Sequence, residues 1–158
     1  MTASTSYKFL SSVANTAKMH EERLRDALER LSTILPINEQ KLAKLSKDDY
    51  AYLDVIAVRY AKLQDLIGSK IFAILLEVMA EPIESNRFLD MLAHLEKIGI
   101  LESVDFWLDL RNVRNSIAHE YPEEPQLLIQ NINNLYSCSL KLLGFWEKLL
   151  KEINALAS

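Results

Sequence analysis

Cysteine, glycine and proline are all scarce in this sequence. The chain of 158 residues contains one cysteine, three glycines and four prolines. The single cysteine, Cys138, excludes a disulfide within the chain and is typical of a protein in a reducing cytosol. The low glycine and proline content, with Ala, Leu, Glu and Lys plentiful, indicates a helical protein. No strand pattern or internal repeat appears beside the helical pattern, so we expect an all-α fold.

Long apolar runs and an excess of positive charge are also missing. The most apolar stretch, residues 66–80, contains Lys70 and Glu77 and is too short to span a bilayer. The N-terminus lacks the basic and apolar regions of a secretory signal. A net charge of -4 and a pI near 5.4 argue against a bulk electrostatic nucleic-acid binder. We therefore expect a cytoplasmic protein without membrane contact, in which any RNA or nucleotide contact rests on a few placed Arg and Lys side chains.

The spacing of apolar residues predicts the architecture. With 49% apolar residues, the chain can bury the core of a single domain, residues 1–158. Apolar residues three and four apart predict five helices, over about residues 4–35, 48–80, 85–99, 103–120 and 126–155. The expected fold is an all-α helical bundle with an up-and-down core, in which residues 1–36 form a long N-terminal helix and residues 48–155 form the motif-bearing bundle. The first helix is amphipathic and long enough to lie against a neighbouring chain.

A few residues are expected to mark helix ends and close contacts. Asp48 or Asp49 is expected to cap the second helix, and Ser103 the fourth. The third helix should begin at residue 85 or 86, and Gly99 should close it. Gly68 lies inside the second helix, where glycine costs about 1 kcal/mol relative to alanine, so it should mark a close contact with another helix.

The most unusual stretch is residues 111–122, where an Arg, an Asn, a His and a Tyr gather at the end of the fourth helix. One face of this helix reads as an ordinary core stripe, formed by Phe106, Leu110, Val113 and Ile117. A second face carries Val104, Trp107, Leu108, Arg111, Arg114, Asn115 and Ala118, with His119 at its margin. Solvated faces seldom mix Trp and Leu with Arg and Asn, so this second face should meet a partner or line a cleft.

Three residues of this stretch can act on one chemical group. His119 follows Asn115 by four residues and Arg114 by five, so all three side chains can reach one region at the helix end. A helix C-terminus favours the protonated imidazole, which suits an acid/base catalyst near neutral pH. Arg114 supplies a fork of charged donors and Asn115 neutral donors, a set that can handle a phosphodiester. From spacing alone, a structural role in capping helix carbonyls fits equally well.

Arg111 lies one turn before Asn115 and has two interpretations. Its guanidinium can support the site by binding phosphate, or it can form a salt bridge with Asp105, Asp109 or a neighbouring group.

The remaining chemistry-bearing residues have simpler interpretations. His20 is expected at an exposed helix position, His94 in a half-buried packing role, and Cys138 as a small buried residue. The chain has no phosphate-binding glycine loop, no nucleophile elbow and no histidines or cysteines at metal-ligand spacing. We therefore expect neither a metal nor a cofactor.

Residues 114–121, Arg-Asn-Ser-Ile-Ala-His-Glu-Tyr, place a His five residues after an Arg and a Tyr two residues after the His. This pattern resembles the signature of HEPN domains. The final Tyr makes it similar to the HepT branch, the toxin half of HepT/MNT toxin-antitoxin modules. Residues 59–68 and 95–101 also look like stretches of such proteins, so the resemblance covers roughly residues 50–150. The long first helix lies outside the motif match.

The resemblance implies a metal-independent endoribonuclease that works as a homodimer. Arg114 and His119 would be the catalytic pair and Asn115 the accompanying polar residue. Tyr121 would be modified with AMP by a partner nucleotidyltransferase antitoxin, which silences the enzyme. Cleaving RNA through its own 2′-OH requires a base, an acid and positive charge on the transition state. Each chain offers one suitable His, and a two-fold dimer would supply two.

Two other functional classes remain open. The chain could be a non-catalytic partner of a nucleotidyltransferase that contributes to nucleotide or substrate binding. It could also be a helical interaction protein in which Arg114 and His119 are structural. A neighbouring gene for a minimal nucleotidyltransferase would support the ribonuclease and the binding partner over the interaction protein.

Overall fold

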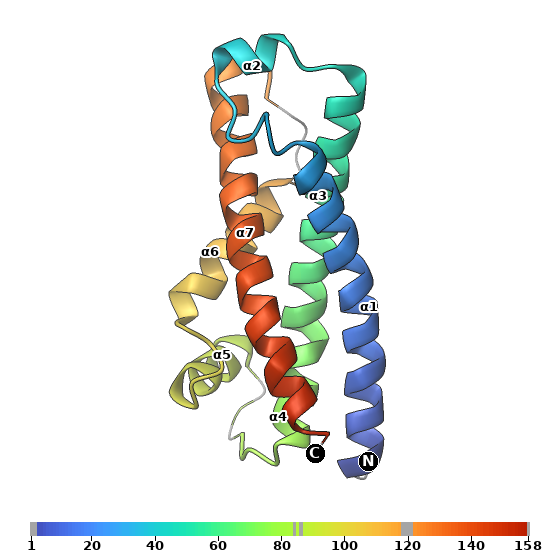
Figure 1. The fold of residues 1–158 in the computed structure, drawn as a ribbon. Helices are drawn as coiled ribbons and strands as arrows, with labels where there is room; N and C mark the ends of the chain where they lie inside the picture. Colours follow the sequence, from blue (N-terminus) through green and yellow to red (C-terminus); the bar gives the residue numbers. More distant parts are fainter. Residues whose placement is uncertain (1–2, 84, 86, 118–121, 158) are drawn as a thin grey trace.

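Four long helical segments run alternately up and down beside one another (Figure 1). The structure is a computed structural model that describes residues 3–83, 85, 87–117 and 122–157. The four segments are α1 (Ala3–Arg30), the continuous run α3 (Lys47–Leu66), η1 (Ile67–Ile71) and α4 (Phe72–Val78), then α6 (Val104–Ile117) and α7 (Pro125–Ala155). Two shorter helices, α2 (Glu39–Ala43) and α5 (Phe88–Lys97), lie in the connections. Within the described ranges every regular element is helical, which confirms the predicted all-α, up-and-down bundle.

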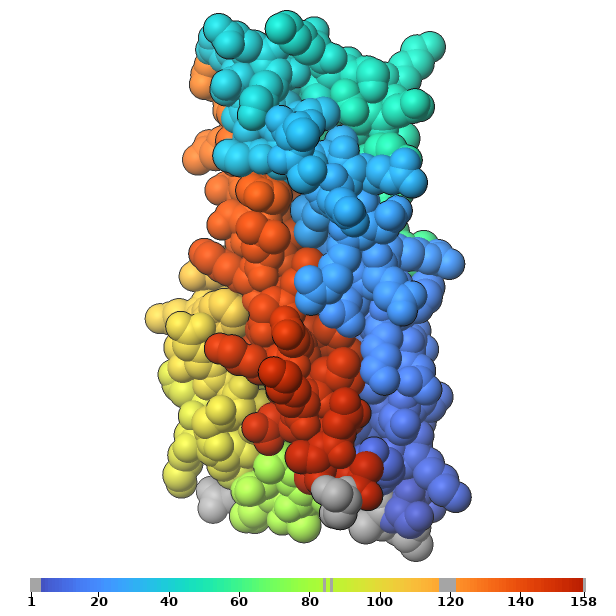
Figure 2. All heavy atoms as spheres, in the orientation of Figure 1, coloured from blue at the N-terminus to red at the C-terminus, as the bar shows by residue number. Residues whose placement is uncertain are grey.

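The long N-terminal helix belongs to the core of its own chain. Its apolar stripe is buried against α3, α4 and α7, and Figure 2 shows α1 and α7 lying against each other on one face of the molecule. The stripe consists of Leu10, Val13, Ala14, Ala17, Leu24, Ala27, Leu28 and Leu31. The helix therefore needs no neighbouring chain to cover its apolar side. None of the helices in the described part of the chain combines the length and the apolar character needed to cross a bilayer.

The helix ends differ from the predicted ones by a few residues. α1 ends at Arg30, and turns carry the chain over residues 31–34 to the cis peptide between Leu35 and Pro36.

The chain after this peptide is fixed to α7, because the Asn133 side chain accepts from the Ile37 N–H at 2.7 Å and donates to the Ile37 carbonyl at 2.9 Å. Two hydrogen bonds to one backbone unit hold this connection in place.

The predicted cap of the second helix was wrong. Ser46, not Asp48 or Asp49, caps α3: its side chain accepts from the Asp49 N–H at 3.0 Å, and the Asp49 carboxylate accepts from the Ser46 N–H at 2.9 Å. This reciprocal pair satisfies two backbone donors at once, which a capping aspartate further along could not do. Ser103 does cap α6, since its hydroxyl accepts from the Phe106 N–H at 2.9 Å.

The third helix also starts later than predicted. α5 begins at Phe88 after an extended Arg87, rather than at residue 85 or 86. Its predicted end is confirmed, because Gly99 has a φ of 82°, a left-handed conformation that glycine adopts without strain.

Candidate functional site

α6 carries the Arg-Asn stretch, and its position is set by a buried hydrogen bond to α3. The Tyr60 hydroxyl donates to the Leu110 carbonyl at 2.6 Å, and both residues are buried. Burial raises the pKa of the Tyr60 hydroxyl well above its ordinary value, and the nearby Cys138 raises it further. Tyr60 therefore remains a protonated donor throughout the physiological range, and α6 is held against α3 one turn before Arg114.

Trp107 lies in the core, whereas the sequence placed it on the second face of the helix. Its ring is fully buried, and its centroid lies 4.8 Å from that of Phe72 and 5.6 Å from that of Phe145. Phe106 and Val113, from the predicted core stripe, are only half-buried. The helix is therefore rotated relative to the prediction, because burying an indole removes more apolar surface from water than burying a valine.

Gly68 makes room for this indole. A Cβ built on Gly68 would lie 3.2 Å from Trp107 Cζ2 and 3.3 Å from Nε1, closer than most real contacts of this kind. The predicted close helix contact at Gly68 is thus confirmed, with Trp107 as the partner.

A cleft of about 280 Å³ opens beside this contact, between α6, α5 and the α3–η1 segment. Arg111 and Arg114 both line it, so the expectation that their face lines a cleft is confirmed. The other lining residues are Gln64, Asp65, Gly68, Ser69, Phe88 and Trp107.

Arg114 contacts two different oxygens. Its Nη1 donates to Asn115 Oδ1 at 3.0 Å, and its Nη2 lies 3.6 Å from Asp65 Oδ1. The side chains of Arg114 and Asp65 are 38% and 60% exposed. Exposed ion pairs contribute little free energy, so the guanidinium can exchange Asp65 for a ligand. The structure therefore brings Arg114 and Asn115 together, as the sequence predicted.

Arg111 does not form the ion pairs considered for it. Its guanidinium lies over the Phe88 ring, 5.0 Å from the centroid, and the described residues give it no ion pair with Asp105 or Asp109. The helix geometry explains this, because residues two or six positions apart point in different directions. Arg111 is therefore held at the cleft by an aromatic face, and no hydrogen bond or ion pair to another described residue occupies its N–H donors.

Two of the predicted site residues lie outside the described part of the chain. His119 and Tyr121 belong to residues 118–121, which lie outside the described residues, as does the predicted helix end near Glu120. The structure carries the stretch up to Ile117, so the arrangement of the proposed catalytic histidine and of the modification site remains a prediction.

His20 was wrongly expected to be exposed. It is only 8% exposed, and its Nδ1 lies 3.0 Å from Arg59 Nη1. Burial lowers the pKa of His20, and the positive charges of Arg59, Lys62 and Arg23 lower it further. The signal was present in the sequence, because position 20 lies three residues after buried Ala17 and thus continues the apolar stripe of α1.

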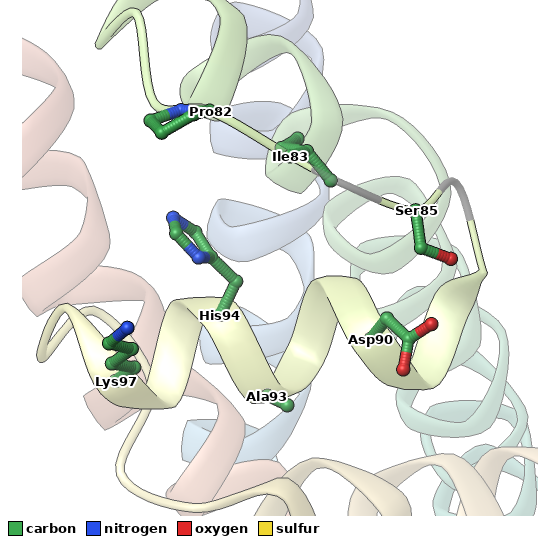
Figure 3. A pocket seen from close by; sticks show the side chains of 7 residues that line it. All are labelled: Pro82, Ile83, Ser85, Asp90, Ala93, His94 and Lys97. Carbon is green, nitrogen blue, oxygen red and sulfur yellow. The ribbon is translucent and has the colours of Figure 1, made fainter.

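A second cleft, of about 540 Å³, lies between α5 and the segment that precedes it (Figure 3). His94 points from α5 toward Pro82 across this cleft, and its Nε2 lies 3.1 Å from Glu81 Oε2. His94 is half-buried, as predicted. The lining also includes Asp90 and Lys97, so it mixes both signs of charge and selects neither anions nor cations.

The other chemistry-bearing groups offer no second reactive centre. Cys138 is buried, as predicted, and burial raises the pKa of its thiol, which keeps the sulfur protonated and unreactive. Among the described residues, no three His, Cys, Asp or Glu side chains lie close enough together to hold a metal ion.

The fold and the cleft together define a class: an all-helical bundle with a small, arginine-lined cleft beside the end of α6. Comparison with protein-family models, with curated proteins and with solved structures gives no match to this chain.

Proposed function

We propose that this protein is a metal-independent endoribonuclease of the HEPN type and the HepT branch, active as a homodimer. The observation that carries the proposal is the pair of Arg114 and Asn115 at the rim of the cleft, in which the Arg114 guanidinium contacts Asn115 Oδ1 and the exposed carboxylate of Asp65. The sequence places His119 just over one turn further along. An arginine that can exchange its partner supplies the positive charge, and a histidine supplies one of the two proton-transfer groups, that RNA cleavage requires.

Each residue has a defined task in this proposal. The 2′-oxygen of the RNA attacks the adjacent phosphorus, and the bond from phosphorus to the 5′-oxygen breaks. His119 takes or returns the proton, and Arg114 stabilises the charge that develops on the phosphoryl oxygens. Asn115 orients the Arg114 guanidinium through the hydrogen bond of 3.0 Å. Arg111, held over Phe88, supports phosphate binding from the same cleft.

The homodimer follows from the need for both an acid and a base. One chain supplies one His119, and a two-fold axis beside α6 would bring a second copy to the same phosphate. The exposed valines Val55 and Val58 share a face of α3 with Asp65, at spacings of three and seven residues. Association over this face would cover the valines and bring the two clefts together.

The proposal is tested by RNA cleavage in the presence of EDTA. We expect the wild-type chain to cut RNA, with activity per chain that rises with protein concentration until the dimer is fully formed. His119→Ala and Arg114→Ala should each lower the rate by at least about 100-fold, because each removes a transition-state interaction. Arg30→Ala, which removes an exposed arginine that lies over Tyr52, is the matched control and should cut normally.

Two outcomes would contradict the proposal. Equal background cleavage by wild type and His119→Ala would exclude the ribonuclease. A large fall in melting temperature for Arg114→Ala would assign that arginine a structural role.

The ion pair of Arg114 with Asp65 favours an alternative function, a non-catalytic nucleotidyltransferase partner that binds nucleotide or substrate. A carboxylate beside the arginine opposes the negative charge of a phosphorane-like transition state.

Tyr121 is the proposed switch, modified with AMP by a nucleotidyltransferase antitoxin. Its position two residues after His119 would place an added phosphate beside Arg114, where its bulk and negative charge would compete with RNA. After coexpression with such a nucleotidyltransferase, mass spectrometry should find an AMP group on the peptide that contains Tyr121. Tyr121→Phe should lack it and keep its cleavage activity. An unmodified wild-type peptide would exclude this form of silencing.

A further inference from the structure

The indole N–H of Trp107 is buried without a hydrogen-bond partner among the described residues. Such groups are rare, because an unpaired buried donor loses its hydrogen bonds to water without replacement. The indole nitrogen can only donate, so the missing partner must be an acceptor. Trp146, the other tryptophan of the chain, has its partner: its Nε1 donates to Glu21 Oε1 at 3.0 Å.

The unpaired donor lies at the wall of the arginine-lined cleft. Trp107 and Gly68 both line this cleft, and a Cβ on Gly68 would lie 3.3 Å from Trp107 Nε1. Because Gly68 carries no side chain, the indole nitrogen lies in close contact with η1 at this wall of the cleft, and its surface is closed to water. An acceptor atom that moves in between Gly68 and the indole meets an N–H already stripped of water.

The backbone of the facing wall is unusual at the same point. Gly68 belongs to η1, a π-helical segment in which the Phe72 N–H bonds to the Ile67 carbonyl, five residues back. π-helical turns inside α-helices occur often at functional sites. Next to it, the side chain of Gln64 is only 3% exposed and lines the cleft.

The charges of the cleft select the ligand. Trp107, Arg111 and Arg114 follow one another at spacings of four and three residues on α6, so they succeed one another along one side of the helix. Among the described residues that line the cleft, two guanidinium groups face one carboxylate, Asp65, and that carboxylate is already paired with Arg114 at 3.6 Å. A cleft with excess positive charge and unpaired donors suits an acceptor-rich anion.

We propose that this cleft binds a phosphate group of a nucleotide, with one phosphoryl oxygen accepting from Trp107 Nε1 beside Gly68. Arg111 and Arg114 neutralise the charge of the phosphate at the rim. The inference rests on the proposed function, in which the occupant is a phosphate of the RNA next to the bond that is cut. The cleft thereby positions the substrate, and Trp107 is a binding residue that takes no part in proton transfer.

The two tryptophans make this proposal directly measurable. In a proton–nitrogen correlation spectrum, the chain should show two indole N–H signals, and replacing Trp146 with Phe assigns them. We expect the Trp107 signal to shift with saturation as inorganic phosphate, a 5′-mononucleotide or a 2′-O-methyl RNA oligonucleotide is added at constant ionic strength. The Trp146 signal, already bonded to Glu21, should stay in place. Saturation at lower concentration with the oligonucleotide assigns the site to RNA, and equal saturation assigns it to free phosphate compounds.

Two variants localise the response. Gly68→Ala puts a methyl group beside the indole nitrogen and should abolish the shift, whereas Gly144→Ala, whose Cβ meets nothing within 4 Å, should keep it. Because Gly68→Ala can also displace the indole, Arg111→Gln is the second variant. Arg111→Gln leaves Gly68 and the indole unchanged. It should weaken binding of the phosphate compounds about tenfold, through loss of one charge-assisted hydrogen bond.

Several results would overturn the proposal. These are a Trp107 signal that no phosphate compound moves, equal movement of both tryptophan signals, an unchanged response in Gly68→Ala, or an equal response to sodium acetate. The titration measures binding without cleavage, so it separates the two proposals. A chain that responds at Trp107 but never cuts RNA keeps this site and loses the ribonuclease, and a chain that cuts RNA with an unresponsive Trp107 does the reverse.

Discussion

At the scale of single residues, the ion pair between Arg114 and Asp65 controls the candidate site. The 3.6 Å separation and the exposure of both side chains make this a weak pair in water. A phosphate offers the guanidinium two acceptor oxygens in fork geometry, which a carboxylate at this distance does not provide. The pair can therefore hold the arginine in place while the cleft is empty and give way when an anion enters.

The contact of buried His20 with half-buried Arg59 should make the stability of the bundle depend on pH. Burial first, and then the charges of Arg59, Lys62 and Arg23, lower the pKa of His20 below its ordinary value of 6.5. The unfolded chain therefore takes up this proton at a higher pH than the folded chain. The contribution of neutral His20 to the free energy of unfolding is complete above pH 6.5. It is lost as the pH falls below that value, by at most about 1.4 kcal/mol per pH unit.

Urea unfolding between pH 7.5 and pH 5.5 checks this prediction. The free energy of unfolding of the wild type should fall more steeply toward pH 5.5 than that of His20→Gln, which cannot take up the proton. His94→Gln is the control, because it replaces a half-buried histidine on α5 and leaves the contact of His20 with Arg59 intact. It should keep the steep wild-type fall. A His20→Gln variant with the wild-type slope would show that His20 does not cause the effect.

At the scale of elements, α3 matters most, because it carries Gln64, Asp65 and, through η1, Gly68 to the cleft. Its start depends on the reciprocal bonds between Ser46 and Asp49. Ser46→Ala should destabilise the protein by about 1 kcal/mol, since it leaves the first turn without its side-chain acceptor.

The midpoint of urea unfolding measures this loss, and Ser32→Ala is the matched control. Ser32 is exposed in the turn after α1, where its backbone N–H donates to the Glu29 carbonyl. Its replacement should change the midpoint little. Equal midpoints for Ser46→Ala and the wild type would mean that the cap contributes nothing to the stability of α3.

The helices also show which features of the fold the spacing of apolar residues can predict. Apolar residues three and four apart predicted every long helix, because that spacing directly reflects the turn of the helix. The ends were less accurate, since Ser46 and Arg87 act through hydrogen bonds and backbone angles of single residues. The π-helical turn at Gly68 was not predicted, because residues 67–76 are apolar on several sides of the helix and therefore hide the shift that an extra residue causes in an apolar stripe.

At the scale of the whole molecule, the arrangement of the helices explains how an acidic chain can have an anion site. The net charge is -4, yet α6 places two arginines beside α3, where Asp65 is the one carboxylate that faces them in the described part of the chain. Affinity for nucleic acid should therefore be confined to the cleft and its rim.

The sequence by itself determined the helical class, the order of the long helices, the close contact at Gly68 and the gathering of Arg114 and Asn115. These follow from local periodicity and from neighbours within one or two turns. The tertiary structure alone decided which side of α6 is buried, with Trp107 in the core and Arg111 over Phe88. It also decided that Asp65 faces Arg114. The physical reason is that a periodic pattern identifies the residues that share a face, whereas the neighbour of that face comes from a distant part of the chain.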